Sequence, residues 1–295
     1  MGSYTSKLRR ILAAGAFVAA AGTLSGCSSL AYQPTDTIYA DPSRANVKFE
    51  SLDFQSRDGT RLHGWFFPAS SEWKGPAKGT IIQFHGNAEN MTSHFASLFW
   101  VIDAGYNFFT FDYRGYGGSD GSPNQKGVND DAYAAVDFIS KKIPRTGSRK
   151  DIVLYGQSLG GGVLMRAYRD IRAQEALHDR VRAMVIESSF YSYKTTGRSF
   201  LARTWFTFLF QPLAYVLVSD EYSPEDDIPN ISPTPLLVIH GDEDPVMPFS
   251  FGQKIFEKAK EPKTFWKIEH GHHIDAMRRQ NGIYREKLIS FLDEL

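Results

Sequence analysis

The chain has 295 residues, of which 42% are hydrophobic, and its 33 Lys and Arg balance 33 Asp and Glu to a formal net charge of zero. That length suffices for one large α/β domain or two small ones, and the balanced charge offers no basic surface to a nucleic acid. The single cysteine excludes an intramolecular disulfide and any zinc or iron–sulfur site built from several cysteines.

The first residues have the pattern of a secretory signal. Lys7, Arg9 and Arg10 precede an apolar run from Ile11 to Leu24, whose 14 residues fall short of the ~20 that span a bilayer. Small residues and the only cysteine, Cys27, follow this run. The segment resembles the lipobox of bacterial lipoproteins, which implies that Cys27 is lipidated and becomes the mature N-terminus. A plain signal peptide with a chance cysteine and an uncleaved anchor are the alternatives.

The predicted domain organisation follows from this signal. Residues 1–26 are expected to be the signal peptide, and the polar residues 27–45 a lipid-anchored tether. Gram-negative lipoproteins that stay at the inner membrane tend to have Asp after the lipidated cysteine. This chain has Ser28 there, which favours the cell envelope at the periplasmic face of the outer membrane. The folded domain is expected over residues 46–295.

Strands and helices are predicted to alternate along the folded domain. It opens with a hairpin, because Asp58-Gly59 separates two β-rich runs at Asn46–Gln55 and Arg61–Pro68. The strands that follow are Thr80–His85, Asn107–Asp112, Ile152–Tyr155, Val181–Glu187, Leu236–His240 and Thr264–Ile268; the helices are His94–Ala104, Asn129–Lys141, Gly161–Arg172, Ser250–Lys260 and Gly282–Leu295. This order predicts a mostly parallel sheet with helices on both faces. Ligands bind such sheets at the carboxyl ends of the strands, so the loops there are where functional residues are expected.

Two segments match the G-x-S-x-G pattern of a nucleophilic serine. Gly156–Gly160 places Ser158 between a predicted strand and a predicted helix, which is the context of a nucleophile elbow. Gly117–Gly121 places Ser119 before Ser122-Pro123, which cannot begin a helix in register, so this match is interpreted as a glycine-rich turn. A serine needs a base and an orienting acid to act as a nucleophile.

The acid is expected after the strand Leu236–His240. Asp242, Glu243 and Asp244 lie together in this turn, and the pattern H-G-x-x-D-x-x-x-P favours Asp244 over Asp242. Asp242 is interpreted as a turn or cap residue.

The base is expected after the strand Thr264–Ile268, since the order Ser, acid, His is typical of this elbow. Three histidines compete there, and the run His273-Ile274-Asp275 favours His273 over His272 and then His270. A metal site at this cluster is disfavoured, because no second cluster of ligands accompanies it.

Acyl transfer also needs N–H donors for the oxyanion. The backbone N–H of Leu159, directly after the nucleophile, is one candidate, and that of Asn87 in His85-Gly86-Asn87-Ala88 is the other. His85 is expected to brace this loop rather than to act as a base.

These motifs together resemble the α/β-hydrolase superfamily, in particular Bem46-like proteins within the wider serine aminopeptidase-like (S33) group. The resemblance rests on the His85–Ala88 loop, on Phe111–Gly117, on Gly156–Gly160, on His240–Asp244 with Pro248 and on His273–Asp275. It implies an eight-stranded α/β-hydrolase fold, a triad of Ser158, Asp244 and His273, and oxyanion donors at Asn87 and Leu159.

A helical cap is expected over about residues 190–233. The stretch Phe190–Leu217 has nine aromatic residues, and inserts after the sixth strand of this fold commonly cover the serine. An apolar substrate pocket, a surface against the membrane and ordinary helix packing are the three interpretations.

The main functional hypothesis is a membrane-anchored serine hydrolase that cleaves carboxylic esters or thioesters, with a small-molecule or lipid-like substrate and no cofactor, metal or nucleic acid. A serine aminopeptidase-type enzyme is the second hypothesis, and it would need a carboxylate for the substrate amine, for which Glu187 and Glu221 are the candidates. A non-catalytic lipoprotein that uses the fold as a binding module is the third. The chain has no nucleotide-binding motif.

Overall fold

The computed structural model describes residues 32–45, 47–143, 151–203 and 207–295. The predicted signal peptide and Cys27 lie outside the described residues. Within those ranges, no helix combines the length and the apolar character that crossing a membrane requires.

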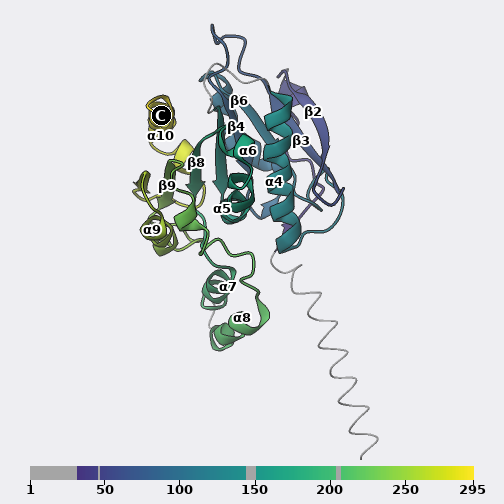
Figure 1. The fold of residues 1–295 in the computed structure, drawn as a ribbon. Helices are drawn as coiled ribbons and strands as arrows, with labels where there is room; N and C mark the ends of the chain where they lie inside the picture. Colours follow the sequence, from purple (N-terminus) through teal and green to yellow (C-terminus); the bar gives the residue numbers. More distant parts are fainter. Residues whose placement is uncertain (1–31, 46, 144–150, 204–206) are drawn as a thin grey trace, which may run out of the picture.

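An eight-stranded sheet forms the centre of the molecule, in the order β10-β9-β8-β7-β4-β6-β3-β2 (Figure 1). β3 runs antiparallel to β2 and β6, and the other neighbouring strands are parallel. The bounds are β2 Glu50–Gln55, β3 Arg61–Phe67, β4 Thr80–Phe84, β6 Asn107–Phe111, β7 Ile152–Gln157, β8 Val181–Glu187, β9 Leu236–Gly241 and β10 Lys263–Ile268. The predicted hairpin and the mostly parallel sheet are confirmed.

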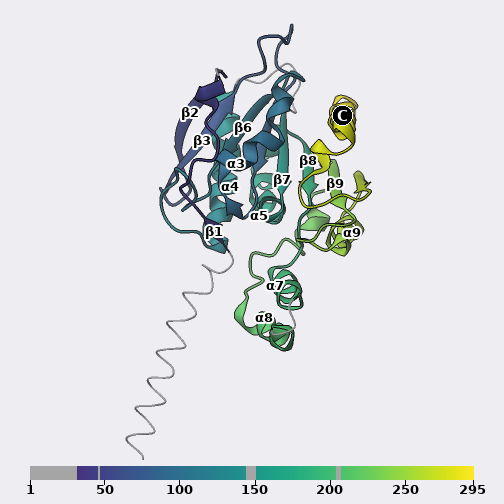
Figure 2. The ribbon, with the colours of Figure 1, turned by 180° about the vertical axis from the view of Figure 1, so that it is seen from behind.

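Helices cover both faces of this sheet, so the molecule has two hydrophobic cores (Figures 1 and 2). One core lies under α4 (Gln125–Lys142), α5 (Leu159–Arg172) and α9 (Phe249–Lys258). The other lies under α3 (Met91–His94), the 3-10 turns that follow it and α10 (Ile283–Asp293). The central strands β4 and β7 are buried along their whole length, as expected of strands covered on both faces.

Two predicted helices differ from the structure. The helix predicted over His94–Ala104 is instead the short α3 and two 3-10 turns, Phe95–Ser97 and Phe99–Ile102. The helix predicted to begin at Asn129 begins at Gln125. Its N-cap is Asn124, whose Oδ1 accepts a hydrogen bond from Gly127 N at 2.8 Å. Asn129 lies inside the helix, where its side-chain amide donates to the carbonyl of Gln125.

The chain contacts the domain from Tyr32 onwards, within the segment predicted as a tether. Tyr32 is only 2% exposed and belongs to the core under α5. β1 (Gln33–Pro34) pairs in parallel with β5 (Ala88–Glu89), and the side-chain amide of Asn90 donates to the carbonyls of Thr35 and Thr37. The polar composition of this segment gave no sign of these contacts, because most of them are made by its backbone.

The predicted cap insert lies between β8 and β9. It contains α7 (Tyr193–Leu201), a 3-10 turn at Phe208–Phe210, α8 (Gln211–Leu217) and a 3-10 turn at Ile228–Asn230. In both views α7 and α8 project from one end of the molecule, beyond the sheet (Figures 1 and 2).

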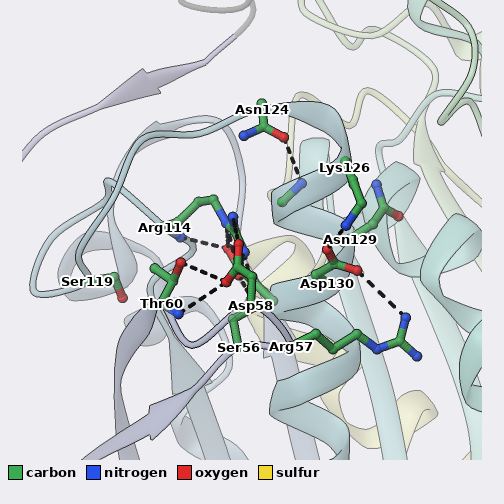
Figure 3. Close-up of polar contacts among 12 residues, drawn as sticks. Ser56, Arg57, Asp58, Thr60, Arg114, Ser119, Asn124, Lys126, Asn129 and Asp130 are labelled. Carbon is green, nitrogen blue, oxygen red and sulfur yellow. Dashed lines mark hydrogen bonds and ion pairs between the residues drawn. The ribbon is translucent and has the colours of Figure 1, made fainter.

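Arg114, in the loop after β6, joins three separate parts of the fold (Figure 3). Its guanidinium donates to Asp131 Oδ1 at 2.7 Å, to Asp58 Oδ2 at 2.7 Å and to Ser56 Oγ at 3.0 Å. Asp131 is completely buried, and burial raises the pKa of its carboxyl while the bonds to Arg114 and Ser56 oppose that rise. Gly127 leaves the space that the guanidinium occupies, since a Cβ there would lie 2.5 Å from Arg114 Cδ.

Arg114→Ala is expected to lower the free energy of unfolding by about 3–5 kcal/mol, because it leaves the buried Asp131 carboxylate without its partner. Arg61→Ala is the matched control. Arg61 also pairs with two aspartates, Asp53 and Asp120, but all three side chains are exposed, so its loss should cost about 1 kcal/mol or less. Urea unfolding followed by circular dichroism measures both. Equal losses in the two variants would contradict the role given to Arg114.

Candidate active site

Ser158 occupies the sharp turn between β7 and α5. Its backbone has φ 52° and ψ −116°, a strained conformation for a residue with a side chain, and its side chain is almost buried at 4% exposure. Glycines permit the close packing around the turn. A Cβ on Gly156 would lie 2.6 Å from Gly161 Cα, and one on Gly160 would lie 2.0 Å from the carbonyl oxygen of Phe84. The local geometry is that of a nucleophile elbow.

Ser119, in the second G-x-S-x-G match, has a different environment. Its Oγ donates to the carbonyl oxygen of Asp112 at 2.7 Å and accepts from His63 N at 2.9 Å. Both bonds fix the glycine-rich turn after β6, so this hydroxyl serves the fold, as the sequence predicted.

The structure brings Asp244 and His273 together from two neighbouring strands. Asp244 follows β9 and His273 follows β10, and His273 Nδ1 donates to Asp244 Oδ2 at 2.8 Å. The other oxygen of Asp244 accepts from the backbone N–H groups of Val246 and Met247. This arrangement orients the carboxylate and leaves Nε2 of His273 as the free ring nitrogen. The tautomer with a proton on Nδ1 is the one that a general base requires.

The pKa of Asp244 is held below its ordinary value. Burial acts to raise it, and the hydrogen bonds from His273, Met247 and Val246 outweigh that effect. The carboxylate is therefore ionised at neutral pH and can stabilise the imidazolium that forms when His273 takes a proton.

The competing residues of both loops have other partners. His270 Nδ1 lies 2.7 Å from Glu243 Oε1, and His272 Nε2 lies 4.0 Å from the same carboxylate; both histidines are exposed. Asp242 pairs with Lys267 at the surface. Among the three histidines and three carboxylates that the sequence offered, only His273 and Asp244 form a pair in which the carboxylate is buried.

Glu187, the last residue of β8, connects the nucleophile to the loop of the base. Its carbonyl oxygen accepts from Ser158 N at 3.0 Å, and its carboxylate oxygen Oε1 accepts from Ala276 N at 3.2 Å. Tyr155 and Gln157 donate to the other carboxylate oxygen. Burial raises the pKa of Glu187, and these hydrogen bonds oppose the rise. Sequence analysis considered Glu187 only as a candidate to bind a substrate amine, and its position directly after the apolar run 183–186 was the one signal of a buried role.

The residues that follow β8 connect Ser158 to the loop of His273 at the carboxyl edge of the sheet. Ile274 N, beside His273, donates to Ser188 Oγ at 3.3 Å, and Ser189 Oγ donates to the carbonyl of Ser158 at 2.8 Å. Within the described part of the chain the two catalytic candidates do not yet share a hydrogen bond. Such bonds are often long without substrate and shorten when it binds.

The two predicted oxyanion donors lie on adjoining segments. The contact between Gly160 and Phe84 brings the first turn of α5 against the end of β4, where the Asn87 loop begins. In the described part of the chain, neither Asn87 N nor Leu159 N has a hydrogen-bond acceptor. The side chain of Asn87 is held separately, since its Oδ1 accepts from Tyr116 OH at 2.8 Å and from Gln33 N at 3.1 Å.

His85 supports this loop from inside the domain, as predicted. It is completely buried, and burial lowers its pKa to about 3, so the ring is neutral. Its Nδ1 lies 2.7 Å from the carbonyl of Gly86, and its Nε2 lies 3.7 Å from Asp112. Burial raises the pKa of Asp112 to about 6, and its carboxylate accepts from Met91 N at 2.8 Å, which fixes the start of α3.

The described residues contain no group of three or more His, Cys, Asp or Glu placed to hold a metal ion.

Comparison with known families finds relatives over most of the chain. The profile of the family described as "Serine aminopeptidase, S33" matches residues 75–228. The protein YfhR of Escherichia coli strain K12 is 38% identical over 263 residues, which cover 88% of this chain and 85% of YfhR. The α/β-hydrolase domain-containing protein WAV2 of Arabidopsis thaliana is 32% identical over 86% of this chain and 81% of its own length.

More distant proteins share the fold. The lysophosphatidylserine lipase ABHD12 of Danio rerio is 29% identical over 217 residues, which cover 71% of this chain and 54% of the lipase. Among solved structures, the Pyrococcus furiosus esterase Pf2001 superposes with a TM-score of 0.69 at 18% identity, covering 89% of this chain and 96% of the esterase.

Proposed function

The chain belongs to the α/β-hydrolase superfamily, and on that premise we propose that it cleaves carboxylic ester or thioester bonds through an acyl-enzyme on Ser158. One observation carries the proposal. A serine in a strained strand–helix turn and the hydrogen-bonded pair of Asp244 and His273 lie at the same edge of one sheet, joined through Glu187. The residues have the order and the roles of a Ser-Asp-His triad.

The reaction follows from the positions of these groups. His273 Nε2 takes the proton of Ser158 Oγ as the oxygen attacks the substrate carbonyl, and Asp244 stabilises the imidazolium. The backbone N–H groups of Asn87 and Leu159 donate hydrogen bonds to the substrate carbonyl oxygen and stabilise the negative charge that forms on it. His273 then donates its proton to the departing alcohol or thiol. Water, activated by the same ring, releases the acid from Ser158.

Two observations favour esters and thioesters over peptides. An aminopeptidase needs a carboxylate free to bind the substrate amine, and Glu187 is buried with its oxygens occupied by Tyr155, Gln157 and Ala276. Glu221, the other candidate, lies at the surface, and in the described part of the chain no contact connects its carboxylate to Ser158 or His273. The cap exposes apolar side chains on α8 and the turn before it, which suits a substrate that resides in lipid. Relatives support this choice, since one is named a lysophosphatidylserine lipase and a neighbour in fold is named an esterase.

We also propose that the enzyme is attached to the membrane through lipid on Cys27, at the periplasmic face of the outer membrane. The support lies in the sequence, namely the basic start, the short apolar run and the lipobox-like end at the only cysteine. A lipid anchor of this kind would keep the domain beside substrates that reside in the bilayer.

A substrate panel tests the proposed chemistry. The purified full-length chain is assayed with p-nitrophenyl esters of increasing acyl length, with acyl thioesters of the same lengths and with amino-acid p-nitroanilides. We expect turnover of esters and thioesters and far slower turnover of the anilides. A preference for the anilides would support the aminopeptidase instead, and turnover of none of the three would support a binding module.

A further inference from the structure

The outward face of the cap is unusually apolar for a protein surface. We define the cap surface as Phe208, Leu209, Phe210, Leu213, Val216 and Leu217, which lie on α8 and the 3-10 turn before it and are all exposed. Leu209 is 82% exposed and Val216 is 78% exposed. A helix on the surface of a globular protein normally presents polar side chains to water, and a contiguous apolar patch marks an interaction site.

Folding of the cap does not account for these side chains. The inward face of α8 is formed by Ala214, which is buried, and a Cβ on Gly197 of α7 would lie 3.6 Å from Ala214 Cβ and 3.4 Å from Val218. Leu209, Leu213 and Val216 follow helical spacing on the opposite side. In the described part of the cap, α7 and α8 therefore meet at Gly197, Ala214 and Val218, while Leu209, Leu213 and Val216 remain exposed.

The N-terminal end of the described chain lies beside the cap. Tyr32 OH is 3.5 Å from the hydroxyl of Tyr193, the first residue of α7. Cys27 precedes Tyr32 by five residues, which can span at most about 18 Å. A lipid on Cys27 would consequently enter the bilayer close to the end of the molecule from which α7 and α8 project (Figures 1 and 2).

The charge of the cap, and its contact with the loop that carries Asp244, also suit a lipid bilayer as the partner. Arg198 is exposed and borders the cap surface, where it donates to Tyr215 OH and to Gln211 Oε1. Cationic side chains beside an apolar surface favour anionic lipid headgroups. Arg203, also exposed, donates to the carbonyl of Val246, two residues after Asp244, so the cap is joined to the loop that carries the acid.

We infer that the cap surface docks on the lipid bilayer to which the chain is anchored, with its apolar side chains in the interfacial region. The docked cap would hold the Ser158 site at the membrane, where acyl chains of bilayer-borne esters can reach it. This inference rests on the proposed lipid anchor at Cys27 and extends it. The anchor supplies attachment, and the cap surface fixes the orientation of the domain.

Single-cysteine fluorescence tests the docking on the processed full-length chain. Lipidation would block the only native thiol, so a cysteine introduced by Leu209→Cys or by Val216→Cys would be the one site for an environment-sensitive dye. Ile283→Cys, an exposed apolar position at the start of α10, is the matched control. The proteins are reconstituted in vesicles of phosphatidylethanolamine and phosphatidylglycerol, and quenching by brominated lipids and by aqueous iodide is measured.

Docking predicts that the dye at both cap positions is quenched by brominated lipids and has lost its quenching by iodide, while the dye at position 283 shows the reverse. Cap positions that behave like position 283 would overturn the inference. Protection from iodide without quenching by brominated lipids would also overturn it, in favour of a second copy of the chain. Labelling of the wild-type chain by the dye would show a free thiol at Cys27 and would overturn the anchor. If the wild-type chain does not hydrolyse a soluble short-chain ester, that result would count against the hydrolase proposal alone.

Discussion

Ser158→Ala is expected to lower kcat for ester hydrolysis by about 10⁴-fold or more while the protein stays folded. The variant removes only the attacking oxygen, because the hydroxyl of Ser158 makes no hydrogen bond in the described part of the chain. The backbone bond from Ser158 N to the carbonyl of Glu187 remains in place. Steady-state kinetics on the best ester of the substrate panel measures the loss, with circular dichroism to verify folding.

Ser119→Ala is the control for this variant, since Ser119 stands in the same five-residue pattern. Its hydroxyl makes two hydrogen bonds, to Asp112 O and from His63 N, so its loss should cost about 1–3 kcal/mol of stability. The kcat of the folded control is expected to be close to that of the wild type. A loss in Ser119→Ala comparable to that in Ser158→Ala would contradict the assignment of the nucleophile.

His273→Ala is expected to lower kcat by about 10³-fold or more, because Ser158 then has no base. Of the three histidines in the loop after β10, only His273 donates to the buried carboxylate of Asp244. His270 and His272 lie at the surface beside Glu243. His270→Ala and His272→Ala are therefore expected to retain nearly full activity.

The pH profile separates a chemical role of His273 from a structural one. The kcat/KM of the wild type should fall toward acidic pH and give the profile an acidic limb, since the reaction needs a neutral imidazole to take the serine proton. The residual activity of His273→Ala should lack that limb. Retention of the limb in His273→Ala together with its loss in His272→Ala would transfer the role of base to His272.

The sequence predicts the parts of the site that depend on chain order. Ser158, Asp244 and His273 each follow an apolar run, and parallel strands place their carboxyl ends at one edge, so the order of the runs was enough to bring these residues together. The choice among the histidines was harder. Spacing alone favoured His273, and the geometry of the turn supplies the reason, because His273 is the one histidine of this loop that lies against the buried carboxylate of Asp244.

The parts that the sequence could not predict depend on backbone hydrogen bonds and on contacts between distant segments. In the sequence Glu187 could be a surface carboxylate. In the structure its carbonyl accepts from Ser158 N and its carboxylate accepts from Ala276 N. The segment from Tyr32 looks like a linker because it is polar, yet its backbone pairs with the loop of Asn87. In α4, Asn124 and Asn129 are both residues that favour a cap, and the structure uses Asn124, whose Oδ1 accepts from Gly127 N.

The central claim is that Ser158 is the nucleophile, and mapping a covalent adduct tests it most directly. The wild-type chain is treated with a fluorophosphonate, digested, and analysed by mass spectrometry. We predict a single modified peptide, with the adduct on Ser158, and no adduct after the triad is disabled by His273→Ala. An adduct on Ser119 or on any other residue, or no adduct on a chain that hydrolyses esters, would contradict the account.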